Sequence, residues 1–118
     1  PLSPEGGRVV SLDADLSNER WRHERKRIDV PGYTGGDPVG AGIALAGGIA
    51  AFTTTVSEQL VILDTRSGAT LKEIHVGTVW SGPSISRGRV YVGTGSILFL
   101  KKELEGSVQC YGLPGVDN

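Results

Sequence analysis

Gln59–Lys72, with the sequence QLVILDTRSGATLK, decides the fold of this chain. It opens with the apolar run Leu60–Leu63, in which two of the four residues are β-branched, and such runs favour β-strands. The run ends at Asp64, and the next four residues, TRSG, have the short polar side chains and the glycine typical of a tight turn. A second strand begins at Thr70. We therefore predict a β-hairpin, which alone would be only marginally stable in water.

The hairpin recurs along the chain. Val10–Trp21, VSLDADLSNERW, repeats it upstream, so that Leu12-Asp13 takes the place of Leu63-Asp64. Ser107–Tyr111, SVQCY, repeats its first strand downstream. A second unit, built as strand, glycine turn and strand, occurs at Gly42–Thr54 and again at Gly82–Thr94. Repetition with a period of about 40–50 residues indicates a solenoid or a propeller.

Composition agrees with a chain of short strands. The 118 residues include 18 Gly and 6 Pro, too many for long helices, and they predict an all-β fold. The net charge of −1 gives no field that would recruit nucleic acid or an anionic membrane, and no apolar run approaches the roughly 20 residues of a membrane span. The single cysteine, Cys110, lies in an apolar strand pattern and is predicted to be a small buried hydrophobic residue.

Strands and turn signals predict nine strands and no confident helix. Asp29–Gly40, DVPGYTGGDPVG, is predicted to be a connection, and within Ser96–Glu105 the stretch Leu98–Leu104 is either a helical turn or a loop hairpin. The basic run Arg20–Arg27 is preceded by Glu19, interrupted by Glu24 and has one aromatic residue, so a charged edge strand explains it better than nucleic-acid binding does. The predicted strands are Arg8–Asp13, Glu19–Arg25, Gly42–Ala46, Ile49–Thr55, Gln59–Asp64, Thr70–Val76, Val79–Ser86, Arg89–Gly95 and Ser107–Gly112.

These motifs resemble the repeat of quinoprotein-type β-propellers, which include the pyrroloquinoline-quinone (PQQ) dehydrogenases and their non-catalytic relatives. The resemblance rests on a Leu-Asp turn with a following tryptophan and on a Gly-Arg-Val-Tyr-Val-Gly-Thr-Gly strand. It implies that the turn and the tryptophan dock adjacent blades, with Lys72 replacing the second tryptophan. The residues to which it assigns this docking role are Asp13, Trp21, Asp64 and Gly68.

The resemblance implies four-stranded antiparallel blades. Residues 8–25 would be a half blade, 42–76 a full blade and 79–112 a three-stranded final blade. Residues 1–118 would then be a partial propeller of about two and a quarter blades, with both ends inside a blade. Its partners would be the remaining blades, from the same protein or a companion chain. The resemblance also suggests a periplasmic or extracellular location.

Two functions are open at this point. One is a binding or scaffold module without catalytic residues of its own. The alternative is part of a quinoprotein dehydrogenase that oxidises alcohols or sugars, with PQQ and calcium held by other blades and no cofactor in this segment. On the rim that would carry the long loops, the candidate ligand-facing residues are Tyr33, Asp37, Trp80, Lys101 and Lys102.

Catalytic patterns are sparse in the sequence. His23 and His75 have no second histidine or carboxylate at metal-ligand spacing, and structural roles are expected for both. Ser81 and Ser84 have no partner base for nucleophilic catalysis. Gly93-Thr94-Gly95 has half the pattern of a phosphate loop but not its Lys-Ser/Thr ending, so strand glycines explain it better.

Overall fold

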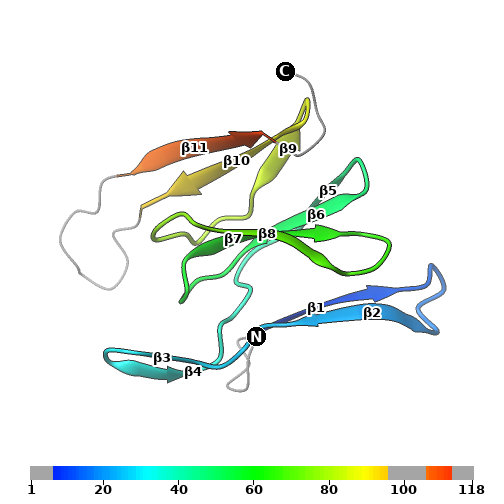
Figure 1. Cartoon of the computed structure of the whole chain (residues 1–118), viewed down its shortest axis with the longest axis horizontal. Helices are drawn as coiled ribbons and strands as arrows, with labels where there is room; N and C mark the ends of the chain where they lie inside the picture. The colour runs from blue at the N-terminus through cyan, green and yellow to red at the C-terminus, as the bar shows by residue number, and fades with distance from the viewer. Residues whose placement is uncertain (1–6, 96–105, 113–118) are drawn as a thin grey trace.

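The computed structural model describes residues 7–95 and 106–112, and every regular element within them is a β-strand (Figure 1). The predicted all-β class is confirmed. The strands are β1 (Arg8–Leu12), β2 (Glu19–Glu24), β3 (Ile28–Val30), β4 (Tyr33–Gly35), β5 (Ala44–Ala46), β6 (Ile49–Thr53), β7 (Gln59–Asp64), β8 (Thr70–His75), β9 (Ser84–Ser86), β10 (Arg89–Thr94) and β11 (Ser107–Gly112).

The described strands form four antiparallel groups. We call β1–β2 the first sheet, β3–β4 the hairpin arm, β5–β6–β7–β8 the central sheet and β9–β10–β11 the last sheet. Strands that follow one another in the chain are neighbours in each group, so every group is a simple meander. The central sheet has the four strands expected for residues 42–76.

Glycine turns set the register of the inner hairpins. Two residues join β5 to β6 and two join β9 to β10, and each turn residue has positive φ: 58° and 82° at Gly47 and Gly48, and 51° and 74° at Arg87 and Gly88. Two successive residues with positive φ define the turn that matches the twist of a two-residue hairpin. These turns therefore determine the pairing of Ala46 with Ile49 and of Ser86 with Arg89.

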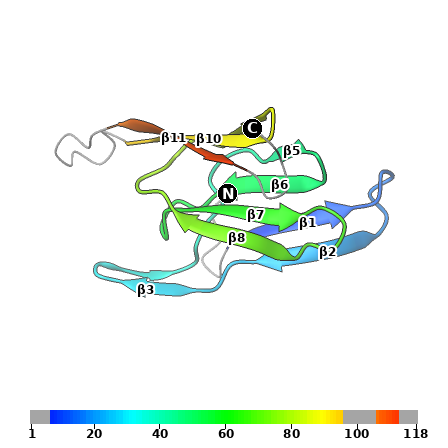
Figure 2. The same ribbon diagram turned by 45° about the horizontal axis from the view of Figure 1, so that its top comes forward.

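The central sheet lies between the other two sheets and is covered on both faces (Figures 1 and 2). Successive residues of a strand point to opposite faces, so β6 and β7 supply both cores. The core toward the first sheet contains Val9, Ala50, Phe52, Val61 and Leu63. The core toward the last sheet contains Ala51, Leu60, Ile62, Val76, Val79, Val90 and Val92.

The outer hairpins share an irregularity. The register of β1 with β2 shifts between Ser11 and Leu12, and the register of β7 with β8 shifts between Ile62 and Leu63. Leu12 and Leu63 are equivalent positions of the sequence repeat. An extra residue of this kind raises the local twist of a strand pair. The two hairpins therefore repeat in shape as well as in sequence.

Two strand predictions are wrong. The expected connection Asp29–Gly40 contains the hairpin arm, so the described residues hold eleven strands and not nine. Its strands have three residues each, IDV and YTG, and are too short to show an alternating pattern. The expected strand Val79–Ser86 is reduced to β9, because Pro83 lacks the N–H that a paired strand requires. The segment Ser96–Glu105 lies outside the described residues.

The prediction of a buried Cys110 is also wrong, because this side chain is exposed. In the last sheet, Val90 pairs with Tyr111, and both residues face the central sheet. Cys110 is the next residue and pairs with Tyr91, so it points to the opposite face. No described strand covers that face.

Candidate functional site

The connections between strands divide between two ends of the stacked sheets. Connections of two to six residues join β1 to β2, β5 to β6, β7 to β8 and β9 to β10 at one end, on the right of Figure 1. The β2–β5 connection with the hairpin arm, the β6–β7 turn and the β8–β9 connection lie at the other end. We call this the loop end. The two longest connections between described sheets, β2–β5 and β8–β9, lie there, and since long connections carry most binding sites the loop end is the candidate functional site.

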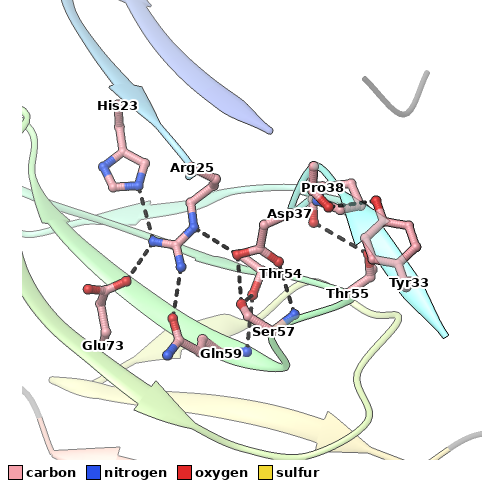
Figure 3. A network of polar contacts seen from close by, with 11 residues as sticks. His23, Arg25, Tyr33, Asp37, Pro38, Thr54, Thr55, Ser57, Gln59 and Glu73 are labelled. Carbon is pink, nitrogen blue, oxygen red and sulfur yellow. Dashed lines mark hydrogen bonds and ion pairs between the residues drawn. The ribbon is translucent and has the colours of Figure 1, made fainter. Parts of the chain in front are cut away.

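An ion pair at the loop end joins the first sheet to the β2–β5 connection (Figure 3). Arg25 Nε lies 3.1 Å from Asp37 Oδ2, and only 10% of the arginine side chain and 1% of the aspartate side chain are exposed. Arg25 follows the end of β2, and its Nη1 lies 2.6 Å from Glu73 Oε2 on β8. Its Nη2 donates to Gln59 Oε1 on β7 at 2.8 Å. One guanidinium thus connects three segments.

The buried Asp37 carboxylate is fully engaged. The backbone N–H of Ser57 donates to Oδ1 at 3.0 Å, and the Ser57 hydroxyl donates to Oδ2 at 2.7 Å. Ser57 lies in the β6–β7 turn and also bonds Thr54 Oγ1, at 2.6 Å. A buried carboxylate is tolerated when it is paired and hydrogen-bonded in this way. Asp37 therefore holds the connection against the central sheet.

Close backbone packing supports this ion pair. The Gly7 carbonyl accepts a hydrogen bond from the Arg25 N–H at 2.8 Å. A Cβ on Gly7 would lie 2.5 Å from the Asp37 carbonyl oxygen, so only glycine fits there. The position of Asp37 thus depends on a glycine that precedes β1.

His23 lies beside the same network. Its ring meets the Phe52 ring edge-on, with centroids 5.5 Å apart and an interplanar angle of 63°. Its Nε2 is 3.4 Å from Arg25 Nη1. Burial lowers the pKa of His23, and the Arg25 charge lowers it further, while Glu73 acts in the opposite direction. His23 is therefore a neutral contact between the first and central sheets, in keeping with its expected structural role.

A second cluster joins the central sheet to the last sheet. Glu58 has φ of 58°, and its carboxylate accepts a hydrogen bond from the Thr78 hydroxyl at 2.8 Å and lies 3.4 Å from His75 Nε2. The Glu58 carbonyl accepts the Val76 N–H at 2.9 Å, and the Thr78 carbonyl accepts the Gly95 N–H at 2.8 Å. At the loop end, hydrogen bonds and ion pairs therefore connect each sheet to the next.

The residues predicted to face a ligand do not form one cluster in the described part of the chain. Tyr33 lies on the hairpin arm, 39% exposed, with its hydroxyl donating to the Gly36 carbonyl. Trp80 is 40% exposed on the β8–β9 connection, whereas Asp37 is buried. Lys101 and Lys102 lie outside the described residues. No local pattern in the sequence marks the functional side chains of Arg25, Ser57, Gln59 and Glu73, because their partners lie far apart in the chain.

The residues predicted to dock adjacent blades lie at two kinds of contact. Trp21 Nε1–H donates to the Thr65 carbonyl at 2.8 Å, and its ring lies against Gly68, so these two residues meet across sheets. The aspartates instead stabilise their own turns: Asp64 Oδ1 accepts the Arg66 N–H at 2.7 Å, and Asp13 Oδ2 accepts from Asn18 Nδ2 at 3.2 Å. Trp21 is half-buried.

The charged strand predicted at Glu19–Arg25 is present as β2. Arg22 pairs with Glu19 at 2.7 Å and with Glu24 at 3.3 Å on the exposed face. Hydrogen bonds to these carboxylates raise the pKa of Arg22. Together with the inward-turned Arg25, these pairs leave the strand with less cationic surface than its sequence suggests.

Cofactor chemistry of the quinoprotein type would need acidic and amide ligands for calcium. Residues 7–95 and 106–112 contain no group of three or more His, Cys, Asp or Glu side chains placed to hold a metal ion. At the loop end, Asp37 is bonded to Arg25 and Ser57, and Glu58 to Thr78. The described donors therefore do not fit such a group. The same ranges contain no helix long and apolar enough to cross a membrane.

The chain is an all-β stack of antiparallel sheets, and polar contacts at the loop end connect these sheets. No protein-family model matches the sequence, and a search of curated proteins gives no match.

Proposed function

We propose that this chain is part of a β-propeller with PQQ-like repeats and acts as a binding or scaffold module. The observation that carries the proposal is that the central sheet packs on the first sheet with the same repeat positions that the last sheet uses to pack on the central sheet. Phe52 of the central sheet faces the first sheet, and Val92, its equivalent in the sequence repeat, faces the central sheet. Leu63 and Tyr111, a second pair of repeat equivalents, share the same relation. Equivalent positions thus make equivalent contacts, as a ring of blades requires.

The approach of the inner strands supports a radial arrangement. β5 and β9 are the first strands of the central and last sheets, and they lie next to each other. A Cβ on Gly82 would lie 2.7 Å from the Gly42 carbonyl oxygen, so the backbones meet where two glycines of the repeat coincide. Strands that converge at the first position of each sheet are expected around the axis of a propeller.

The two end sheets support further blades on both sides. Val108 of the last sheet is 78% exposed, whereas its repeat equivalent in the central sheet, Leu60, is fully buried. Leu12 of the first sheet is 43% exposed, whereas its equivalent, Leu63, is fully buried. Repeat units bury such faces against neighbours, so we expect the neighbours to come from the rest of the protein or from a companion chain.

The hairpin arm supports a binding role. It extends from the body of the sheets in both views, while the Arg25–Asp37 pair holds the connection on either side of it (Figures 1 and 2). Val30 and Tyr33 present apolar surface on the arm. A projecting hairpin on a rigid base can contact a partner without disturbing the sheets, and this arrangement favours a scaffold over an enzyme.

The proposal is tested on the purified full-length protein. Electron-microscopy class averages should show ring-shaped particles. A dye-linked dehydrogenase assay with added PQQ and calcium, run against a panel of alcohols and sugars, should show no turnover. Ring-shaped particles with dye reduction would support the dehydrogenase alternative instead. Particles that are not ring-shaped would contradict the proposed propeller fold.

A further inference from the structure

An apolar groove of about 350 Å³ lies between the first sheet and the inner part of the central sheet. It continues the core between these sheets, because Val9 and Ala50 belong to both. The groove is open along the edge of β1 that faces away from β2. Among the described residues, no strand pairs with that edge. Side chains that line it include Val9, Trp21, Ile43, Leu45, Ala50 and Arg66.

The inner edge of β1 can accept another strand. Paired residues of an antiparallel ladder alternate between those that exchange hydrogen bonds and those that point outward. The bond from the Arg25 N–H to the Gly7 carbonyl fixes this alternation at the start of β1. Arg8 and Val10 therefore direct their backbone N–H and C=O groups to the inner edge, which no described strand occupies.

The repeat shows what belongs beside this edge. In the central sheet β6 pairs with β7, and in the last sheet β10 pairs with β11. Each of these inner partners is the second strand of a hairpin with a two-residue turn. β1 is the repeat equivalent of β7, so the same kind of hairpin fits beside it.

Two apolar groove residues are more exposed than their repeat equivalents, which have such a neighbour. Leu45 is 69% exposed, whereas its equivalent in the last sheet, Ile85, is partly buried against the central sheet. Ile43 is 43% exposed, whereas its equivalent, Pro83, is buried. In the last sheet, Ile85 packs against the core that includes Ala51 of the inner hairpin of the central sheet. In the central sheet the same positions are apolar and face the groove.

We propose that this groove is a docking site for a β-hairpin of the β5–β6 kind, whose second strand pairs antiparallel with β1. Main-chain hydrogen bonds to Arg8 and Val10 supply the affinity, and small apolar side chains that enter the groove over Leu45 supply the specificity. The inference rests on the proposed function, since it names the partner of one incomplete blade. It commits to a hairpin of the same repeat and not to an unrelated peptide.

The test uses the 118-residue chain and a synthetic peptide with the sequence of residues 42–55, extended by one lysine at each end. Amide hydrogen exchange of the chain is measured with and without the peptide. The Arg8 and Val10 amides should slow by at least about tenfold, since a new ladder bond must open before exchange. In a Leu45→Asp chain this protection should disappear. In a Val108→Asp chain, altered at an exposed apolar residue of the last sheet, it should remain.

Absence of protection at β1 would overturn the inference. Protection confined to β11, or protection at β1 that Leu45→Asp leaves unchanged, would do the same. A second peptide with aspartate in place of Ala51 tests the small-residue requirement and should not protect β1. These outcomes are separate from the ring and dye-reduction tests of the full-length protein, so a propeller whose groove rejects the peptide is distinguishable from a protein that is not a propeller.

Discussion

The indole of Trp21 lies directly against the backbone of Gly68, so that a Cβ on Gly68 would fall 2.7 Å from the ring. The first sheet and the β7–β8 turn of the central sheet meet at this contact. Gly68 also has φ of 77°, a conformation that side chains disfavour. Two separate properties of glycine are therefore used at one position.

We predict that Gly68→Ala lowers the free energy of unfolding by about 2–4 kcal/mol, from positive-φ strain plus displacement of Trp21. Gly48→Ala is the matched control, because Gly48 has φ of 82° and nothing within 4 Å of its Cβ position. It should cost only about 1–2 kcal/mol. Denaturant titration of both variants gives the difference. Equal losses would mean that the indole contact contributes nothing.

Trp21 should stabilise the folded chain in two ways, through the hydrogen bond of its indole N–H and through the packing of its ring. Trp21→Phe removes the hydrogen bond to the Thr65 carbonyl and should cost about 1 kcal/mol. Trp21→Ala also removes the ring and should cost about 2–3 kcal/mol, near the low end for large core residues because the side chain is half-buried. Urea denaturation midpoints of the two variants separate the parts. If the alanine variant keeps the wild-type midpoint, Trp21 does not join the sheets.

Asp37→Asn should destabilise the loop end by about 2–4 kcal/mol, because it leaves the buried Arg25 with a weaker partner. Glu73 continues to pair with Arg25 and keeps the loss from being larger. Asp29→Asn is the control, since Asp29 accepts a hydrogen bond from Thr34 on the exposed hairpin arm, and it should change stability by less than about 1 kcal/mol. Equal effects of the two changes would show that burial of Asp37 is unimportant.

Acid should weaken the contact between the first and central sheets through His23. The unfolded chain protonates this histidine near the ordinary pKa of 6.5, whereas burial and Arg25 lower the pKa in the folded chain. The unfolded state therefore binds more protons just below pH 6.5, and stability should fall as the pH decreases through that value. It should level off once the folded histidine is also protonated.

Denaturant midpoints of wild type and His23→Gln at pH 7.5 and 5.5 check this prediction. The difference between the two pH values should be smaller in the variant, because glutamine does not titrate. An identical pH dependence in both proteins would assign the effect to other groups.

Cys110 should react with a maleimide in the folded chain, because its side chain is exposed on β11. The reaction rate without denaturant should be close to that in urea. A Val90→Cys, Cys110→Ala variant provides a buried thiol for comparison, since Val90 is fully buried on β10. Equal protection of the two thiols would mean that the outer face of the last sheet is covered.

Sequence reasoning locates the elements whose signal is local. The apolar runs at β6, β7 and β10 and the glycine turns between paired strands are visible as patterns, because their side chains alternate around residues with fixed turn chemistry. The predicted strands Gln59–Asp64 and Ser107–Gly112 have the bounds that the structure gives. The hairpin arm is missed because its three-residue strands are too short for any detectable alternation.

Other features depend on contacts that a sequence does not display. Asp37 looks like an exposed loop carboxylate, but Arg25 and Ser57 bury it, and both come from other segments. Cys110 lies in a strand pattern that looks like a core strand, yet it faces the side of the last sheet that no described strand covers. Whether a strand side chain is buried depends on the sheet that covers its face as well as on the sequence of its own strand.

The matched register shifts at Ser11 and Ile62 make the chain divisible into interchangeable parts. A segment cut at each shift, residues 12–62, begins and ends at equivalent positions of the two hairpins. A gene that duplicates this segment in tandem would join like to like at the new boundary and lengthen the array by one sheet. Growth of the protein by internal duplication, in evolution or by engineering, thus needs no junction that the chain does not already contain.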